Sequence, residues 1–163
     1  MSSPQQEISV LQPDARIELF EIDLSPIGNP AILRFCNSKI GLPLSLAGAE
    51  YKPWAIKVSN YGSSTDGALP TPSVTLSNYK GVVSSLLDLY RPQGAIFRRR
   101  LILRRNLDDG GDPRPEAQFL PDEFTVDRWG ENRRFVTLFL ESALAYLNTE
   151  IPGRRIISLR TGP

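Results

Sequence analysis

The arginines of residues 97–105 are the side chains best suited to recognition chemistry. This segment reads FRRRLILRR. In a β-strand, alternate side chains share a face and lie roughly 6–7 Å apart, so Arg98, Arg100 and Arg104 would form a row. Guanidinium groups bind carboxylates and phosphates through paired hydrogen bonds. We therefore expect a candidate subunit interface here, while a solvated face, protection of a sheet edge or phosphate binding would use the same pattern.

Two acidic groups are the next candidates. Asp122, Glu123 and Asp127 could supply the carboxylate pair of a carbohydrate hydrolase, but no other feature of the sequence supports that reaction. Residues 108–112 (DDGGD) gather oxygen ligands of the kind that calcium binds. They do not match the twelve-residue calcium loop, and no Glu closes the site at the required spacing. We therefore expect a solvated loop at residues 108–112.

The side chains that most enzymes use for catalysis are scarce. The sequence has no His and a single Cys, Cys36, which can form no internal disulfide. Strand alternation around residues 33–37 predicts that this thiol is buried as a small apolar side chain. Neither a glycine-rich phosphate loop nor a dinucleotide-binding glycine pattern is present. We therefore expect no catalytic residue, no cofactor and no metal ion, and a protein that acts by binding other molecules.

The charge balance limits the partners further. The 163 residues include 19 Lys or Arg and 18 Asp or Glu, for a net charge of +1, and 40% are hydrophobic. Nucleic-acid-binding domains usually carry a basic excess on one face, so direct DNA binding is not expected. The alternative is a small nucleic-acid-binding β-barrel, in which Tyr51, Trp54 and Tyr61 stack on bases beside the arginine strand.

The N-terminus has neither a basic start nor an apolar run, so we expect no signal peptide. No apolar stretch approaches the ~20 residues of a membrane span. The chain is therefore expected to be made in the cytosol and to be soluble.

Period-two alternation predicts that most of the chain is β-strand. Residues 16–24 alternate polar and apolar side chains, and their better core face carries Phe20, Ile22 and Leu24, with carboxylates opposite. Residues 94–107 form the strongest predicted strand. Residues 133–142 are apolar on both faces, which predicts a strand at the centre of its sheet.

One helix and two loops complete the expected architecture. Apolar residues at helical spacing predict a short helix near 81–90, which Asn78 could cap. Residues 60–72 and 106–115 are rich in turn-forming residues and predict exposed loops. The pattern favours a mainly β fold, a short-stranded sandwich or barrel with one short helix, built as one domain or as two small modules divided near 60–72.

Five segments, taken in order, carry a family resemblance. Residues 19–24 read LFEIDL, 34–37 RFCN, 46–53 LAGAEYKP, 71–78 TPSVTLSN and 151–156 IPGRRI. Each is short, but their order and spacing cover nearly the whole chain. In this respect the sequence resembles the minor tail protein L family of lambda-like tailed bacteriophages.

The resemblance implies a structural role in the virion. Such proteins are components of the phage tail tip, and they join the distal tail ring and tube to the central hub that carries host recognition. The implied partners are the distal tail protein, the central hub or receptor-binding tip protein and the tape measure protein. By analogy with threefold tail-tip hubs, the resemblance also implies a homotrimer in a ring, synthesised in the host bacterial cytoplasm.

The resemblance also suggests how the chain is divided. Residues 16–157 would form the tail-tip β domain, after a flexible arm at 1–15 and before a C-terminal tail at 158–163. The IPGRRI segment adds three residues to the candidate subunit interface, namely Pro152, Gly153 and Arg154.

Family members carry a cysteine-rich region after that segment, associated with an iron–sulfur cluster. Four thiolates hold such a cluster, and Cys36 alone cannot. Either this phage dispenses with the region, another chain supplies it, or the chain is a fragment. We therefore expect no cluster here.

Overall fold

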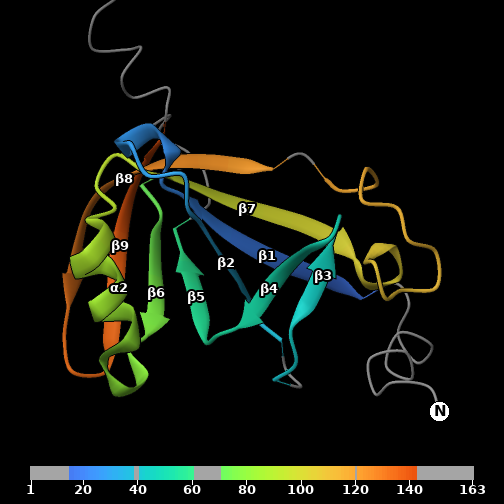
Figure 1. Ribbon diagram of the computed structural model, residues 1–163, viewed down its shortest axis with the longest axis horizontal. Coiled ribbons are helices and arrows are strands. Elements are labelled where there is room, and N and C mark those ends of the chain that lie inside the picture. Colours follow the sequence, from blue (N-terminus) through green and yellow to red (C-terminus); the bar gives the residue numbers. More distant parts are fainter. Residues whose placement is uncertain (1–14, 39–40, 61–70, 120, 143–163) are drawn as a thin grey trace, which may run out of the picture.

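A computed structural model describes residues 15–38, 41–60, 71–119 and 121–142. In these residues nine strands form one sheet, in the order β3-β4-β2-β1-β7-β8-β9-β6-β5 (Figure 1). The strands are β1 (Arg16–Asp23), β2 (Ile32–Cys36), β3 (Leu44–Leu46), β4 (Ala49–Pro53), β5 (Ile56–Ser59), β6 (Ser73–Ser77), β7 (Ile96–Leu103), β8 (Asp122–Glu131) and β9 (Phe135–Ser142). With the short helix α2 (Val82–Tyr90), this confirms the predicted mainly β fold.

The sheet curves back on itself because the chain passes directly from β4 to β5, which lie towards opposite ends of the strand order. All neighbouring strands are antiparallel except β2 and β4, which are parallel. At the crossing, the Trp54 backbone N–H donates to the Cys36 carbonyl at 2.9 Å. The Asn37 side-chain amide reaches the Ile56 carbonyl at 3.4 Å. Figure 1 shows β5 and β6 brought round close to β2 and β4.

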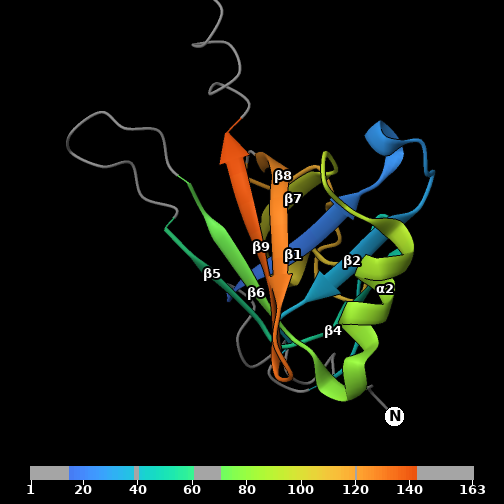
Figure 2. The ribbon, with the colours of Figure 1, turned by 90° about the vertical axis from the view of Figure 1, so that its left-hand side faces the viewer.

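The larger hydrophobic core lies between the curved sheet and α2. It confirms the predicted core face of β1, since Phe20, Ile22 and Leu24 are all buried, and Phe20 stacks on Phe97 with ring centroids 6.1 Å apart. Helix α2 contributes two buried residues to this core, Val83 and Leu87. Figure 2 shows α2 lying along one side of β9.

A second core covers the opposite face of β1. Leu19 of β1 and Cys36 of β2 pack under the β3–β4 hairpin, with Leu44, Leu46 and Tyr51 above them. β1 is therefore buried on both faces, and its two inner carboxylates, Glu21 and Asp23, are buried as well. The alternation of polar and apolar residues identified the face of β1 that carries these carboxylates. It did not predict that the β3–β4 hairpin would cover that face.

Local hydrogen bonds set the ends of α2 and of the β8–β9 hairpin. Gly81 occupies the N-cap position of α2, and the Asn78 side-chain oxygen accepts the N–H of Ser84 in the first turn at 3.1 Å, so Asn78 supplies a capping hydrogen bond from three residues before the N-cap. In the hairpin, the Asn132 side-chain oxygen accepts the backbone N–H groups of Arg134 and Phe135, each at 2.8 Å. β9 lies between β8 and β6, so the prediction of a central strand is confirmed.

One predicted strand is wrong in extent. The strand predicted at 94–107 ends at Leu103, and a 3-10 turn (Arg104–Asn106) follows it, so Arg104 leaves the row of alternate arginines. Residues 51–58 form parts of two strands, because the extended run breaks after Pro53.

Several predictions lie outside the described residues. These are the predictions for nearly all of the arm at 1–15, for most of the loop at 60–72 and for the tail at 158–163. The residues Tyr61, Pro152, Gly153 and Arg154 also lie outside the described part of the chain. Strands from before and after residues 61–70 pair within the one sheet, as β1 does with β7 and β5 with β6. In the described parts of the chain, no helix has the length and apolar character that crossing a membrane requires.

Candidate assembly surface

The register of four strands places arginines and carboxylates side by side on one face of the sheet. Glu21 of β1 lies opposite Arg34 of β2 on one side and opposite Arg98 of β7 on the other. Arg98 in turn lies opposite Glu123 of β8. Directly opposed side chains in a sheet are within contact distance, so unlike charges in these positions attract.

Arg98 bridges two carboxylates of its own chain. Its Nη1 donates to Asp23 Oδ2 at 2.9 Å, and its Nε donates to Glu123 Oε1 at 2.8 Å. Asp23 also accepts the Ser25 backbone N–H at 2.9 Å. The hydrogen bonds from Ser25, followed by that from Arg98, lower the pKa of Asp23 to about 2.

Glu21 is the centre of the most buried part of this face. Arg100 Nε lies 3.2 Å from its Oε2 and Arg34 Nε lies 3.7 Å from its Oε1. Both Nε atoms are buried and make ion pairs rather than hydrogen bonds with Glu21. Tyr51 donates its phenol proton to Glu21, and burial followed by this hydrogen bond raises the pKa of Tyr51 well above its usual range. Arg100 also donates from Nη1 to the Gln118 side chain at 2.9 Å.

The third arginine of the predicted row belongs to a different environment. Arg104 is 3% exposed and makes two hydrogen bonds to Asp109, at 3.2 and 3.0 Å. Arg99 lies on the other face of β7 and bonds Glu18 and Asp122. Arg98, Arg100 and Arg104 thus all pair within the chain, and their chemistry here is to tie strands and loops together. Whether Arg98 and Arg100 also contact a neighbouring subunit stays a prediction.

The acidic residues considered for hydrolysis are not brought together as a pair. Asp122 and Glu123 are consecutive in β8 and therefore point to opposite faces. Each is bonded to an arginine of β7, Asp122 to Arg99 and Glu123 to Arg98. Asp127 lies at a register shift in β8. These three residues therefore form no carboxylate pair for a glycosidic bond.

The acidic loop at 108–112 is used by the protein itself. The Asp108 carboxylate accepts the N–H groups of Ala47 and Gly48 at 2.9 and 2.8 Å, which fixes the β3–β4 turn to the loop. Asp109 bonds Arg104, and Asp112 bonds Arg114 at 3.1 Å. Within the part of the chain that the structure describes, no three His, Cys, Asp or Glu side chains are grouped to hold a metal ion.

The aromatic residues proposed to stack on bases belong to the cores instead, so this prediction is wrong for the two that are described. Tyr51 is 2% exposed under the β3–β4 hairpin. Trp54 packs against the larger core and donates its indole N–H to the Ser77 carbonyl at 2.7 Å. Cys36 is buried as predicted, and burial raises the pKa of its thiol. A single thiol in an apolar cluster does not fit an iron–sulfur cluster.

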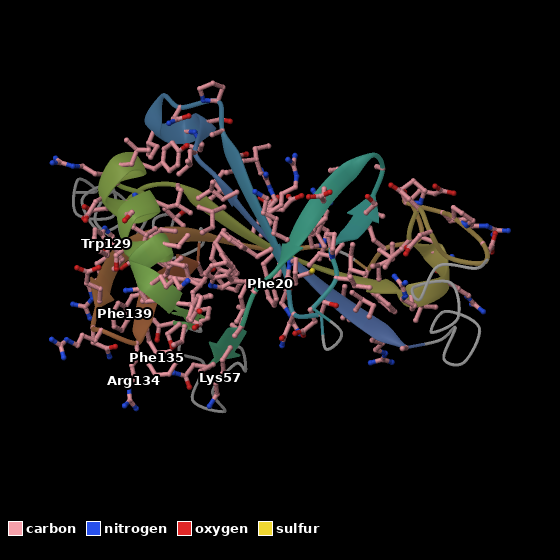
Figure 3. The ribbon with its side chains drawn as sticks, turned by 60° about the horizontal axis from the view of Figure 1, so that its bottom comes forward. Phe20, Lys57, Trp129, Arg134, Phe135 and Phe139 are labelled. Carbon is pink, nitrogen blue, oxygen red and sulfur yellow. The ribbon has the colours of Figure 1, made fainter. Side chains whose placement is uncertain are left out.

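Strand β9 exposes two large apolar side chains that the sequence did not identify as a surface. Phe135 and Phe139 of β9 are 46% and 39% exposed, while Val136, Leu138 and Leu140 between and beside them are buried. Figure 3 shows the two phenylalanines following one another along β9, with Arg134 beyond Phe135. The apolar residues on both faces of residues 133–142 indicated a central strand, and they also contained the signal for this exposed apolar surface.

Two comparisons with known proteins find similar sequences. The model of a family described as phage minor tail protein L matches residues 25–161. Tail tip protein L of Escherichia phage lambda is 28% identical over 126 residues, which cover 76% of this chain and 54% of that relative. The chain therefore spans about half the length of the curated relative it matches.

Proposed function

Because the chain belongs to the phage minor tail protein L family, we propose that it is a non-enzymatic structural component of the phage tail tip. The family match carries the proposal, since it runs from just after β1 through every later strand of the described fold. In this role the protein joins the distal tail ring and tube to the central hub that carries host recognition. Its neighbours are the distal tail protein, the hub protein and the tape measure protein, and its own copies form a threefold ring.

The site geometry supports binding rather than chemistry. The charged side chains that could have formed an active site are bonded to one another across the sheet, for example Arg98 with Asp23 and Glu123. Such a network fixes the shape of a subunit without providing a free acid or base. The solvent-exposed phenylalanines, by contrast, are the kind of surface that a protein partner covers.

The test is to locate the protein in the virion. Tails from a phage carrying an epitope-tagged chain would be purified and imaged by cryo-electron microscopy, with the untagged phage as control. We expect the described fold to fit density at the tip, in three copies between the distal ring and the hub. Absence of the chain from purified tails would overturn the proposal.

The nucleic-acid alternative has a separate readout. A phosphate-binding surface gives affinity for DNA that falls linearly with salt concentration on logarithmic axes. The purified chain should show no such binding. A steep salt dependence would instead favour the alternative, and it would direct attention to the exposed arginines of the β8–β9 hairpin rather than to the paired arginines of β7.

A further inference from the structure

Helix α2 carries an exposed apolar stripe along one flank of its core-facing side. Val83 and Leu87 are buried, whereas Val82 and Leu89 are 43% and 71% exposed, with Leu86 partly exposed between them. Positions 82, 86 and 89 fall at the i, i+4, i+7 spacing of one helical face. We call these three residues the helix stripe. The apolar surface of this nine-residue helix is therefore wider than the part that packs on the core.

The outer side of β9 is the second uncovered apolar surface. Phe135, Thr137 and Phe139 alternate with the buried residues of the strand, and we call these three residues the sheet face. Thr137 lies opposite Gly130 of β8 and Thr75 of β6, so only small side chains lie between the rings of Phe135 and Phe139, and we call this strip the low floor. The Arg128 guanidinium covers part of the Phe139 ring, 4.8 Å from its centroid.

The two surfaces lie on different sides of β9. Val136, Leu138 and Leu140 share the larger core with Val83 and Leu87, so α2 is on the inner side of β9. The residues of the sheet face alternate with the buried ones and therefore point to the other side of β9, whereas the helix stripe lies on the flank of α2. Figure 2 shows α2 on one side of β9. One molecule cannot cover its own sheet face with its own helix stripe, but two copies in the same orientation can.

The dimensions of the two surfaces match. Phe135 and Phe139 are four residues apart on a strand, which places them about 13 Å apart. Val82 and Leu89 span about 10 Å of helix, and the exposed Tyr79 extends the apolar surface beyond Val82. A helix laid along β9 would therefore contact both rings and rest on the low floor between them.

Charges at the ends of the two surfaces select one direction. Arg133 and Arg134 lie at the Phe135 end of the sheet face, whereas at the Phe139 end Glu141 is balanced by Arg128. On the helix, Lys80 lies at the N-terminal end, where it stacks on Tyr79.

Asp88 is at the C-terminal end of the helix, where the helix dipole is also negative, although Arg91 follows there. With α2 antiparallel to β9, Asp88 and the helix carbonyls approach the hairpin arginines, and Lys80 approaches Glu141. The parallel direction would place like charges together.

We propose that the helix stripe of one copy docks on the sheet face of the next copy, with α2 antiparallel to β9. This contact is head-to-tail, so repeated docking closes into a ring when the rotation between copies allows it. It rests on the proposed function in one respect, because it supplies the contact between subunits in the proposed ring.

Mixing two variants tests the contact directly. Leu89→Glu disables the helix stripe and Phe139→Glu disables the sheet face, and both residues are exposed, so each variant should fold. By analytical ultracentrifugation, the unmodified chain should associate with increasing concentration, and each variant alone should be monomeric.

An equimolar mixture should form a dimer and nothing larger, because one intact stripe and one intact face remain between the two chains. Ala117→Glu adds the same charge at an exposed loop position and should associate like the unmodified chain.

The direction of docking has its own test. Asp88→Arg should weaken association at least tenfold, and adding Arg134→Asp to the same chain should restore most of the loss. If Asp88→Arg strengthens association, the helix lies parallel to β9 and the proposed direction is wrong.

Three results would overturn the contact itself. They are an unmodified chain that stays monomeric at millimolar concentration, variants that associate normally on their own, and a mixture that remains monomeric. The proposed function would survive any of these if the chain is still found at the tail tip, so the two proposals fail separately.

Discussion

The buried carboxylate of Glu21 gives the sharpest test of how the fold is held together. Its side chain is 6% exposed and faces Arg34 and Arg100, which are 31% and 24% exposed. Glu21→Gln keeps the size of the side chain and can still accept the Tyr51 hydrogen bond, but it removes the negative charge. Two guanidinium groups then remain in a poorly solvated face of the sheet without their counter-ion.

The expected loss of stability follows from these exposures. Removing one partner of a fully buried ion pair costs about 3–5 kcal/mol. Both arginines retain some contact with water, and Arg100 keeps its hydrogen bond to Gln118, so we expect about 2–3 kcal/mol for Glu21→Gln. For a chain of this length that loss lowers the melting temperature by about 4–12 °C.

Urea unfolding followed by circular dichroism measures this change, with an unchanged m-value required for the comparison. Glu50→Gln is the matched control, because Glu50 is exposed on strand β4, and it should change stability by less than about 0.5 kcal/mol. A double-mutant cycle with Arg100→Gln should give a coupling energy of about 1 kcal/mol or more. If Glu21→Gln is as mild as Glu50→Gln, or the coupling is zero, the network does not stabilise the fold.

Three further predictions concern neighbouring groups. The pKa of Asp23 is lowered from 3.8 to about 2 in the folded chain. Its charge therefore stabilises the fold above pH 4, and that contribution is lost as the pH falls towards 2. Asp23→Asn should make the free energy of unfolding depend less on pH between pH 4 and 2, as measured by fluorescence. The buried Cys36 thiol, whose pKa is raised, should react with a thiol reagent at least a hundredfold more slowly in the native chain than in urea, and equal rates would show that the second core opens freely. Arg98→Glu with Arg100→Glu places two further carboxylates beside Asp23, Glu123 and Glu21, so it should abolish tail assembly in a complementation assay by destabilising the fold, and normal virions from this variant would show that the arginine row is needed neither for folding nor for assembly.

Much of the fold was determined by local sequence pattern. Alternation in β1 identified Phe20, Ile22 and Leu24 as core, and helical spacing with Asn78 identified α2 and its capping hydrogen bond. These predictions succeeded because each depends on a repeat of 2 or 3.6 residues within one element. The family resemblance was likewise readable from short segments in order, and it agrees with the match over residues 25–161.

The environment of the charged residues was not readable in that way. The sequence showed a row of arginines in one segment and carboxylates in two others, separated by tens of residues. Arg98 meets Asp23 and Glu123 because β7 lies between β1 and β8, and that order is a property of the whole sheet. Ending β7 at Leu103 also moved Arg104 out of the row and into a turn with Asp109.

The sequence by itself determined most of the strands, the helix, the main core and the absence of His, because these depend on residue type and local period. Tertiary structure alone decided which charges neutralise one another and which apolar faces stay uncovered. Phe135 and Val136 are similar in a hydrophobicity pattern, yet one faces solvent and the other is fully buried. The difference arises because α2 and the curved sheet cover one side of β9, and no part of the described chain covers the other.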